Sequence, residues 1–305
     1  MNDITIVTAF FDIGRSNYEA IPRTNEKYIN WFEHWARIKN RLIIYCGNQL
    51  VAAKVKEIRR NFNLEEKTEI IIFEDLLAIE EDLYTRLERV GKDCFFKNFR
   101  LIKNATSNIP AYDLINYLKS YFMNDAQKRF NLTTQVAWID FGFNHGGALY
   151  PYPEDYDFEW SYDFGDKVTL FFLAPIDERP IFEIVRTLKP DCIMGCMFIS
   201  PPNLVEKLWV TFLQSAIELT NVGLIDDDQL ILLMSYRKNP TIFRLVESDW
   251  FLPLKTFGGS HLRTVSKSFP GKNILRNIKQ HLSKRIRIIR YLIGNYKVLI
   301  KQKGI

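Results

Sequence analysis

A chain of 305 residues with 47% hydrophobic and 25% charged residues has an ordinary globular composition, which excludes a wholly disordered or collagen-like protein. Its four cysteines are too few for a disulfide scaffold, and Cys192 and Cys196 stand four residues apart, unlike the tight pairs of zinc sites. No apolar run approaches the ~18 residues needed to cross a bilayer. The first residues also lack the charge and apolar length of a secretory signal. We therefore expect a soluble or peripheral protein of the cytoplasm.

The first half of the sequence alternates between strand and helix patterns. Short β-branched and aromatic runs predict strands, and amphipathic stretches predict helices. In chain order the expected elements are strand 3–11, helix 28–38, strand 41–46, helix 51–62, strand 68–73, a helical stretch 109–130 and strand 134–139. This alternation predicts a parallel sheet with helical crossovers.

The second half contains further elements of both kinds. In chain order we expect strand 168–173, strand 192–199, helix 202–219 and a helix from Asp226 to about Tyr236. The chain therefore belongs to the α/β class, with a Rossmann-like mixed, mainly parallel sheet flanked by helices.

Charge is distributed unevenly along the chain. From Trp250 onward there are 13 Lys or Arg residues and no Asp or Glu, and subtracting these 13 charges from the net +5 leaves −8 for residues 1–249. Apolar residues in this basic tail recur at steps of three or four, which predicts a basic amphipathic helix. They are Leu275, Ile278, Leu282, Ile286, Ile289, Ile293 and Tyr296. We therefore divide the chain into a domain at 1–255 and a C-terminal segment at 256–305.

The tail has three possible interpretations. A basic amphipathic helix suits the surface of an anionic membrane. It could equally dock on the body with its basic face in solvent. It could also contact nucleic acid, but the sequence has no helix-turn-helix, zinc-finger or RNA-binding signature, so no nucleic acid is expected.

Two loops follow strands at the edge of the sheet where ligands usually bind. Arg15, after the first strand, could supply a fixed cation for a diphosphate, or it could be a solvated surface residue. Asp140, directly after strand 134–139, could meet a divalent cation or a ribose, or it could cap a turn.

Three consecutive carboxylates, Asp226, Asp227 and Asp228, precede the apolar helix that ends near Tyr236. One of them can cap that helix. Repulsion among three adjacent like charges would raise at least one pKa, which suits a base or a role linked to a metal.

Several of these segments resemble one enzyme family in order and context. Trp138-Ile139-Asp140-Phe141-Gly142 is similar to the region where GT-A glycosyltransferases carry an Asp-x-Asp motif. Three further segments resemble their nucleotide-side helix, acceptor-side strand and acidic helix start: Lys119-Ser120-Tyr121-Phe122, Met194-Gly195-Cys196-Met197-Phe198-Ile199 and Asp228-Gln229-Leu230-Ile231-Leu232. The opening Thr8-Ala9-Phe10-Phe11-Asp12-Ile13-Gly14-Arg15 looks most like HtrL/YibB-type bacterial proteins, which are associated with lipopolysaccharide and capsule gene clusters.

The resemblance implies a GT-A-like fold with the basic C-terminal helical tail appended. It implies transfer of a sugar, most simply from a UDP-sugar, to a lipopolysaccharide or capsule precursor, with the tail on the inner face of the plasma membrane. The implied residues fall into four groups: nucleotide-sugar contacts at Phe10, Arg15, Lys119, Asp140, Gly142 and Gly195; Mn²⁺ or Mg²⁺ at Asp140 and His261; catalysis at Asp228 and Asp227; and acceptor contacts at Asp226, Gln229 and Trp160.

One departure from the family pattern leaves alternatives open. Gly142 stands where the second Asp of the Asp-x-Asp motif is expected, so the need for a metal is an open question. A GT-A-shaped protein that binds a nucleotide or glycan without turnover is the second hypothesis. Trp160 lies in a segment rich in aromatic and acidic residues, 152–166, which could be an acceptor lid or a plain surface loop.

Overall fold

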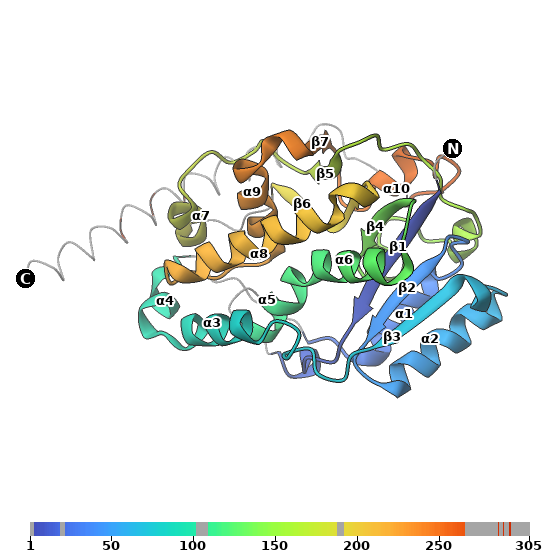
Figure 1. The fold of residues 1–305 in the computed structure, drawn as a ribbon, viewed down its shortest axis with the longest axis horizontal. Helices are drawn as coiled ribbons and strands as arrows, with labels where there is room; N and C mark the ends of the chain where they lie inside the picture. The colour runs from blue at the N-terminus through green and yellow to red at the C-terminus, as the bar shows by residue number, and fades with distance from the viewer. Residues whose placement is uncertain are drawn as a thin grey trace, which may run out of the picture.

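The computed structural model describes residues 3–18, 22–101, 109–187 and 192–265, together with Ile286, Ile289 and Ile293. Among these residues, none of the helices combines the length and the hydropathy that a membrane span requires. Figure 1 shows a central twisted sheet with helices packed on both of its faces.

Seven strands form one mixed sheet in the order β3-β2-β1-β4-β6-β5-β7. Neighbours pair in parallel, except that β6 runs antiparallel to both β4 and β5. The strands are β1 (Ile4–Phe10), β2 (Leu42–Cys46), β3 (Thr68–Ile72), β4 (Gln135–Ile139), β5 (Val168–Phe172), β6 (Ile193–Ser200) and β7 (Phe243–Glu247). The predicted mixed, mainly parallel sheet flanked by helices is confirmed, and so are the six predicted strands. β7 is an additional strand that the sequence analysis did not identify.

Two hydrophobic cores, one on each face of the sheet, hold the helices (Figure 1). One face is covered by α1 (Asn25–Trp35), α2 (Gln49–Asn61), the segment 141–164 and α10 (Pro253–Thr256). The other is covered by α3 (Glu81–Lys92), α4 (Cys94–Phe99), α5 (Pro110–Tyr117), α6 (Lys119–Phe130), α7 (Ile181–Thr187), α8 (Val205–Asn221) and α9 (Asp228–Lys238). The result is a three-layer α/β/α architecture.

The helices differ from the sequence-based expectation in two respects. The single helical stretch expected over 109–130 is two helices, α5 and α6, which meet at Leu118. Helices α3, α4, α7 and α10 were not predicted at all, although Leu83, Leu87 and Val90 of α3 are buried at helical spacing. α3 is rich in charged residues, and its amphipathic pattern is a helix signal that the sequence analysis overlooked.

The central strands place the ends of β1 and β4 side by side. Every residue of β1, β2 and β4 is buried, as expected for strands covered on both faces. β1 and β4 pair in parallel, with Val7 opposite Trp138, so both strands finish at the same edge of the sheet. The loops that follow Phe10 and Ile139 therefore begin next to each other, where ligands bind in open parallel sheets.

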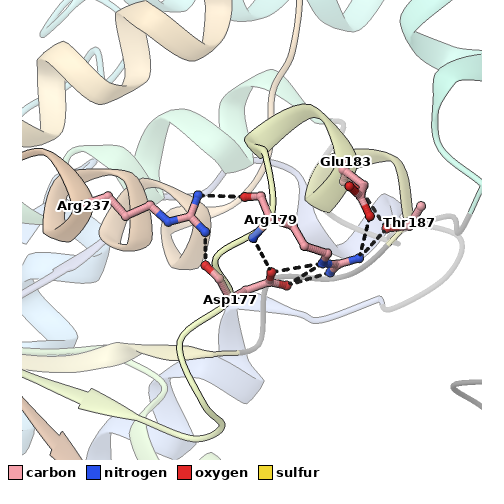
Figure 2. A network of polar contacts seen from close by, with 5 residues as sticks. All are labelled: Asp177, Arg179, Glu183, Thr187 and Arg237. Atoms are coloured by element: carbon pink, nitrogen blue, oxygen red, sulfur yellow. Dashed lines mark hydrogen bonds and ion pairs between the residues drawn. The ribbon is translucent and has the colours of Figure 1, made fainter.

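A polar network fixes the C-terminal half of α9 to the loop between β5 and α7 (Figure 2). Arg237 donates hydrogen bonds to the backbone carbonyls of Asp177 and Arg179. Arg179 in turn pairs with the Asp177 carboxylate at 2.6 Å and donates to the hydroxyl of Thr187 at 3.1 Å. This clamp sets the position of α9, the helix that carries Asp228 at its other end.

The packed body extends past the expected boundary at residue 255. Leu262 is fully buried, and the backbone N–H of Val265 donates to the carbonyl of Leu149 at 2.8 Å. The predicted tail helix lies outside the described residues except at Ile286, Ile289 and Ile293. These three are helical, and 43%, 55% and 50% of their surfaces are exposed.

Candidate functional site

A pocket opens at the carboxyl ends of β1 and β4. Aromatic rings form much of its wall, and its charged lining residues are Arg15, Arg23, Lys119, Asp140 and His145. It encloses about 140 Å³, less than the ~300 Å³ of an ordinary small-molecule pocket. The pocket can therefore enclose one charged part of a larger ligand, with the rest of that ligand outside.

Arg15 is a buried cation whose hydrogen-bonding capacity is largely unused. Its side chain is held in place because Gly14 adopts a left-handed conformation (φ 71°) and starts a short 3₁₀ turn. The guanidinium lies 5.0 Å from the ring centre of Tyr18 and 4.7 Å from that of Tyr112. Arg15 is only 5% exposed, and its Nε and Nη1 atoms have no hydrogen-bond partner among the described residues. Unpaired buried donors are costly, so this geometry favours an anionic ligand.

Arg23 adds a positive charge on the α1 side of the pocket, next to the imidazole of His145. The Arg23 guanidinium lies 5.0 Å from the ring centre of Trp31, and the His145 ring packs on the same indole at 4.8 Å. Burial lowers the pKa of His145, and the nearby Arg23 lowers it further. Arg23 was missed by the sequence analysis, because a lone Arg before a helix carries no sequence signal of its own.

Lys119 joins two of the predicted carboxylates in one buried cluster. Its Nζ atom lies 2.8 Å from Asp140 Oδ1 and 2.6 Å from Asp228 Oδ2, and it donates to the carbonyl of Gly195 at 3.1 Å. Asp140 Oδ1 also accepts a hydrogen bond from the indole N–H of Trp138 at 2.7 Å. Lys119, Asp140 and Gly195, which the sequence analysis assigned to the nucleotide-sugar, therefore meet Asp228, which it assigned to catalysis, at one point.

The electrostatics of this cluster favour the charged form of Lys119. Burial alone lowers the pKa of an ammonium, but the adjacent carboxylates of Asp140 and Asp228 more than offset it and raise the pKa of Lys119 above its ordinary value. Burial raises the pKa of Asp228, and Lys119 opposes part of that rise. Asp140 lines the pocket with 35% of its side chain exposed, whereas 8% of the Asp228 side chain is exposed. Asp228 therefore acts on the pocket through Lys119.

The two aspartates before Asp228 have structural partners. Asp227 caps α9, since its side chain accepts a hydrogen bond from the backbone N–H of Gln229 at 3.2 Å. Asp226 forms a buried ion pair with Arg100 at 2.8 Å. Gln229 is itself buried in the first turn of α9. The helix-cap interpretation therefore holds for Asp227.

Two predicted nucleotide contacts, Phe10 and Gly142, line the pocket. Phe10 stacks on Phe141 with ring centres 4.8 Å apart. Gly142 packs against α1, where a β-carbon would lie 2.9 Å from a ring atom of Trp31. The glycine at the position of the expected second Asp thus allows a close approach of the chain to an aromatic side chain.

Trp160 and His261 lie away from the pocket. Trp160 is fully buried in the core, with its indole N–H donated to the carbonyl of Phe257 at 2.6 Å. His261 is exposed; its Nε2 lies 3.0 Å from the carbonyl of Asp155, and its ring packs on Phe158. The structure therefore does not bring His261 to Asp140, and it gives Trp160 no surface on which a sugar could stack.

The described residues do not form a divalent metal site of their own. Within them, no group of three or more His, Cys, Asp or Glu side chains is placed to hold an ion. Asp140 Oδ1 already accepts from Trp138 and contacts Lys119. A Mg²⁺ ion held by this one carboxylate would depend on water and substrate oxygens for its other ligands.

Comparison with known proteins places the chain in a family. The profile of HtrL_YibB, described as a bacterial protein of unknown function, matches residues 2–259. The chain is also 29% identical over 276 residues to Protein HtrL of Escherichia coli (strain K12), an alignment that covers 85% of this chain and 93% of that relative. The predicted resemblance to HtrL/YibB-type proteins is confirmed: this chain belongs to the HtrL_YibB family.

Proposed function

We propose that this protein is a GT-A-like glycosyltransferase that takes a sugar from a nucleotide donor, most simply a UDP-sugar, and transfers it to a bacterial surface glycan precursor. One observation carries the proposal. A buried arginine with unused donors and a partly exposed aspartate face the same pocket, at the sheet edge where nucleotides bind in open α/β folds. Arg15 supplies donors for the diphosphate, and Asp140 supplies an acceptor for a ribose or sugar hydroxyl.

The aromatic wall suits the remainder of such a donor. Phe10 and Tyr28 line the pocket beside Arg23, with their ring centres 5.3 Å apart. Ring faces of this kind stack on bases and on the apolar faces of sugars. Because the enclosed volume is small, the base or the sugar extends along this wall toward solvent.

The chemistry requires a group that receives a proton. An acceptor hydroxyl loses its proton as it attacks the sugar, and a carboxylate is the usual base. Asp140 is the carboxylate on the pocket wall, so we assign this role to it. Asp228 is a positioning residue that holds Lys119 against Asp140, and Asp227 fixes the helix that carries Asp228.

A second candidate function follows from the same cluster. Lys119 pairs with both Asp140 and Asp228, and a carboxylate held by an ammonium is a weaker base, which would suit a protein that binds a nucleotide or a glycan without turnover. Nucleotide binding without release of free nucleotide from any sugar donor would favour this alternative.

The C-terminal segment supports a peripheral membrane location. The chain has 13 basic and no acidic residues from Trp250 onward, 11 of the basic ones after Val265, and the described isoleucines of the segment are about half exposed. A helix that combines cations with exposed apolar side chains binds anionic bilayers. A glycolipid acceptor would lie at the same surface, on the cytoplasmic face of the plasma membrane.

Calorimetry with the full chain tests the nucleotide site. UDP, GDP, CDP and dTDP are titrated into wild type, Arg15→Gln and the matched control Arg60→Gln, an exposed arginine on α2. We expect one nucleotide to bind wild type and Arg60→Gln equally, and Arg15→Gln at least about tenfold more weakly, since a charge-assisted contact is lost. Binding that Arg15→Gln leaves unchanged, or no nucleotide binding to any protein, overturns the site.

Incubation with the matching nucleotide-sugars then tests turnover. Release of the free nucleotide, with the sugar passed to an added glycan or to water, supports a transferase. Donor binding without any release of nucleotide in the presence of bacterial glycolipid extracts supports the binding protein.

A further inference from the structure

We infer that the Lys119 ammonium supplies, in this pocket, the positive charge that the family resemblance assigns to a divalent metal, and that the pocket binds a diphosphate without a metal ion. We call Lys119 in this role the resident cation of the pocket. The diphosphate class rests on the proposed function. The identity of the resident cation rests on the geometry alone.

The first argument is the coordination of Lys119. Its Nζ atom has three oxygen partners, at Asp140 Oδ1 (2.8 Å), Asp228 Oδ2 (2.6 Å) and the Gly195 carbonyl (3.1 Å). An ammonium has three N–H donors, so the protein uses all of them. Lys119 therefore contributes charge to the pocket and leaves the direct contacts with a ligand to other residues.

The second argument is that the site is built around this side chain. Lys119 is 5% exposed, and β6 has a glycine, Gly195, where a β-carbon would lie 2.2 Å from the Oδ2 atom of its partner Asp228. Replacing the ammonium by a metal would leave a buried lysine without its partners. Removing one member of a buried, hydrogen-bonded ion pair is strongly unfavourable.

The third argument is the charge of the pocket wall. Its lining contains three permanent cations, Arg15, Arg23 and Lys119, against the single carboxylate of Asp140. A metal-dependent site has the opposite balance, because carboxylates gather to hold the ion. Here the wall is already positive, so an anion is attracted without an added cation.

The fourth argument identifies the groups that contact the ligand. Arg15 has two nitrogen atoms without hydrogen-bond partners in the described part of the chain, and its guanidinium lies against the rings of Tyr18 and Tyr112. A planar guanidinium with free donors matches the oxygens of a phosphate. Arg15 therefore binds the diphosphate, while Lys119 offsets one of the two negative charges of Asp140 and Asp228, which would otherwise repel it more strongly.

The test uses full-length protein and two probes. Inorganic pyrophosphate is titrated with EDTA present, and Mn²⁺ is titrated alone and followed by its electron paramagnetic resonance signal. For wild type we expect pyrophosphate to bind in EDTA, and we expect the Mn²⁺ signal to stay that of the free ion. Two results would overturn the inference. One is that wild type binds Mn²⁺ and that Asp140→Asn abolishes this binding. The other is that EDTA abolishes the binding of pyrophosphate.

Variants of Lys119 give the complementary result. Lys119→Met frees both carboxylates, so pyrophosphate should bind at least about tenfold more weakly and Mn²⁺ should now bind. Lys128→Met, an exposed lysine on the same helix, is the matched control and should behave as wild type. Lys119→Arg keeps the charge and should retain pyrophosphate binding, so it replaces Lys119→Met if that variant does not fold.

The two proposals can fail separately. If the protein binds pyrophosphate without a metal but binds no nucleotide-sugar, the role of Lys119 is supported and the transferase proposal is wrong. If the protein turns over a nucleotide-sugar and needs Mn²⁺ at the pocket to do so, the transferase proposal is supported and the role of Lys119 as the cation is wrong.

Discussion

Asp228 lies so close to Gly195 that a β-carbon at position 195 would be 2.2 Å from Asp228 Oδ2. The carbonyl of the same glycine accepts a hydrogen bond from Lys119, which also pairs with Asp228. The lack of a side chain at this position of β6 therefore allows the first residue of α9 to reach the buried ammonium.

This relationship predicts the effect of Gly195→Ala. The new methyl group displaces the Asp228 carboxylate, and we expect a loss of about 1–3 kcal/mol in the free energy of unfolding, as for other overpacked cores. Urea denaturation of the full chain measures it. Because the clash is with the Asp228 side chain, Gly195→Ala should cost at least about 1 kcal/mol less in an Asp228→Ala background. An equal cost in both backgrounds would contradict the argument.

Asp140→Asn separates binding from chemistry. The substitution keeps an oxygen that can accept from Trp138 but removes one negative charge from the pocket wall. We expect the variant to bind pyrophosphate at least as tightly as wild type does. The binding free energy should improve by up to about 1 kcal/mol, because a negative charge that repels the ligand is gone. Sugar transfer should fall by about a hundredfold or more, because the base is lost.

Calorimetry and a nucleotide-release assay measure these two effects. Asp166→Asn, at an exposed position before β5, is the control and should leave both unchanged. A metal-dependent site gives the opposite sign for binding, since Asp140→Asn would then weaken the affinity for the diphosphate.

The sequence predicted the elements that form the pocket, because short apolar runs identify buried strands and the carboxyl ends of parallel strands share one edge. Phe10, Arg15, Lys119, Asp140 and Gly142, five of the six residues assigned to the nucleotide-sugar, line this one pocket. For the residues nearest to the strand ends, local sequence was therefore sufficient.

The rest of the site depends on tertiary contacts that local patterns do not encode. Lys119 and Asp228 are 109 positions apart, and they meet only because α9 packs against β6, α8 and α5. Arg23 and His145 reach the pocket from separate loops around Trp31. Trp160 stood in a segment that resembled a sugar-binding surface, but the same aromatic character buried it in the core.

The network in Figure 2 predicts a stability effect far from the pocket. Arg237→Met removes two hydrogen bonds to the carbonyls of Asp177 and Arg179, and we expect the free energy of unfolding to fall by about 1–2 kcal/mol. Lys238→Met, the next residue, removes only a surface ion pair with Glu218 and should change stability by less than about 0.5 kcal/mol. Equal effects in urea denaturation would show that the clamp does not hold α9.

His145 predicts a pH dependence of stability. Burial first, and then Arg23, hold the pKa of His145 below its ordinary value in the folded state. As the pH falls below about 6.5, the unfolded chain therefore binds a proton before the folded chain does, and stability is lost down to the folded pKa.

His145→Asn removes this titration and tolerates the left-handed backbone at that position (φ 47°). We expect the variant to lose less stability than wild type between about pH 7 and pH 5 in urea denaturation. Arg23→Gln should act in the same direction but more weakly, because it removes only the second cause. Parallel pH profiles for all three proteins would rule out the proton linkage.

The C-terminal segment predicts binding to anionic membranes. The 11 basic residues from Lys267 onward supply an attraction that salt weakens, of about 1 kcal/mol for each cation close to the surface. Its exposed isoleucines, Ile286, Ile289 and Ile293, supply an apolar contribution that salt does not screen. We therefore expect the full chain to co-sediment with phosphatidylglycerol vesicles and not with phosphatidylcholine vesicles, and added salt should reduce this binding without abolishing it.

Replacing the three isoleucines by serine in the full chain isolates the apolar contribution. The partition onto anionic vesicles should fall at least about tenfold, and the binding that remains should disappear at high salt, because only charge is left. The matched control replaces two body residues of similar or greater exposure, Leu50 (70%) and Val222 (69%), by serine and should bind as wild type does. If the triple variant binds as wild type does, these isoleucines do not enter the bilayer. If the control also loses binding, the apolar surface of the body and not the tail makes the contact.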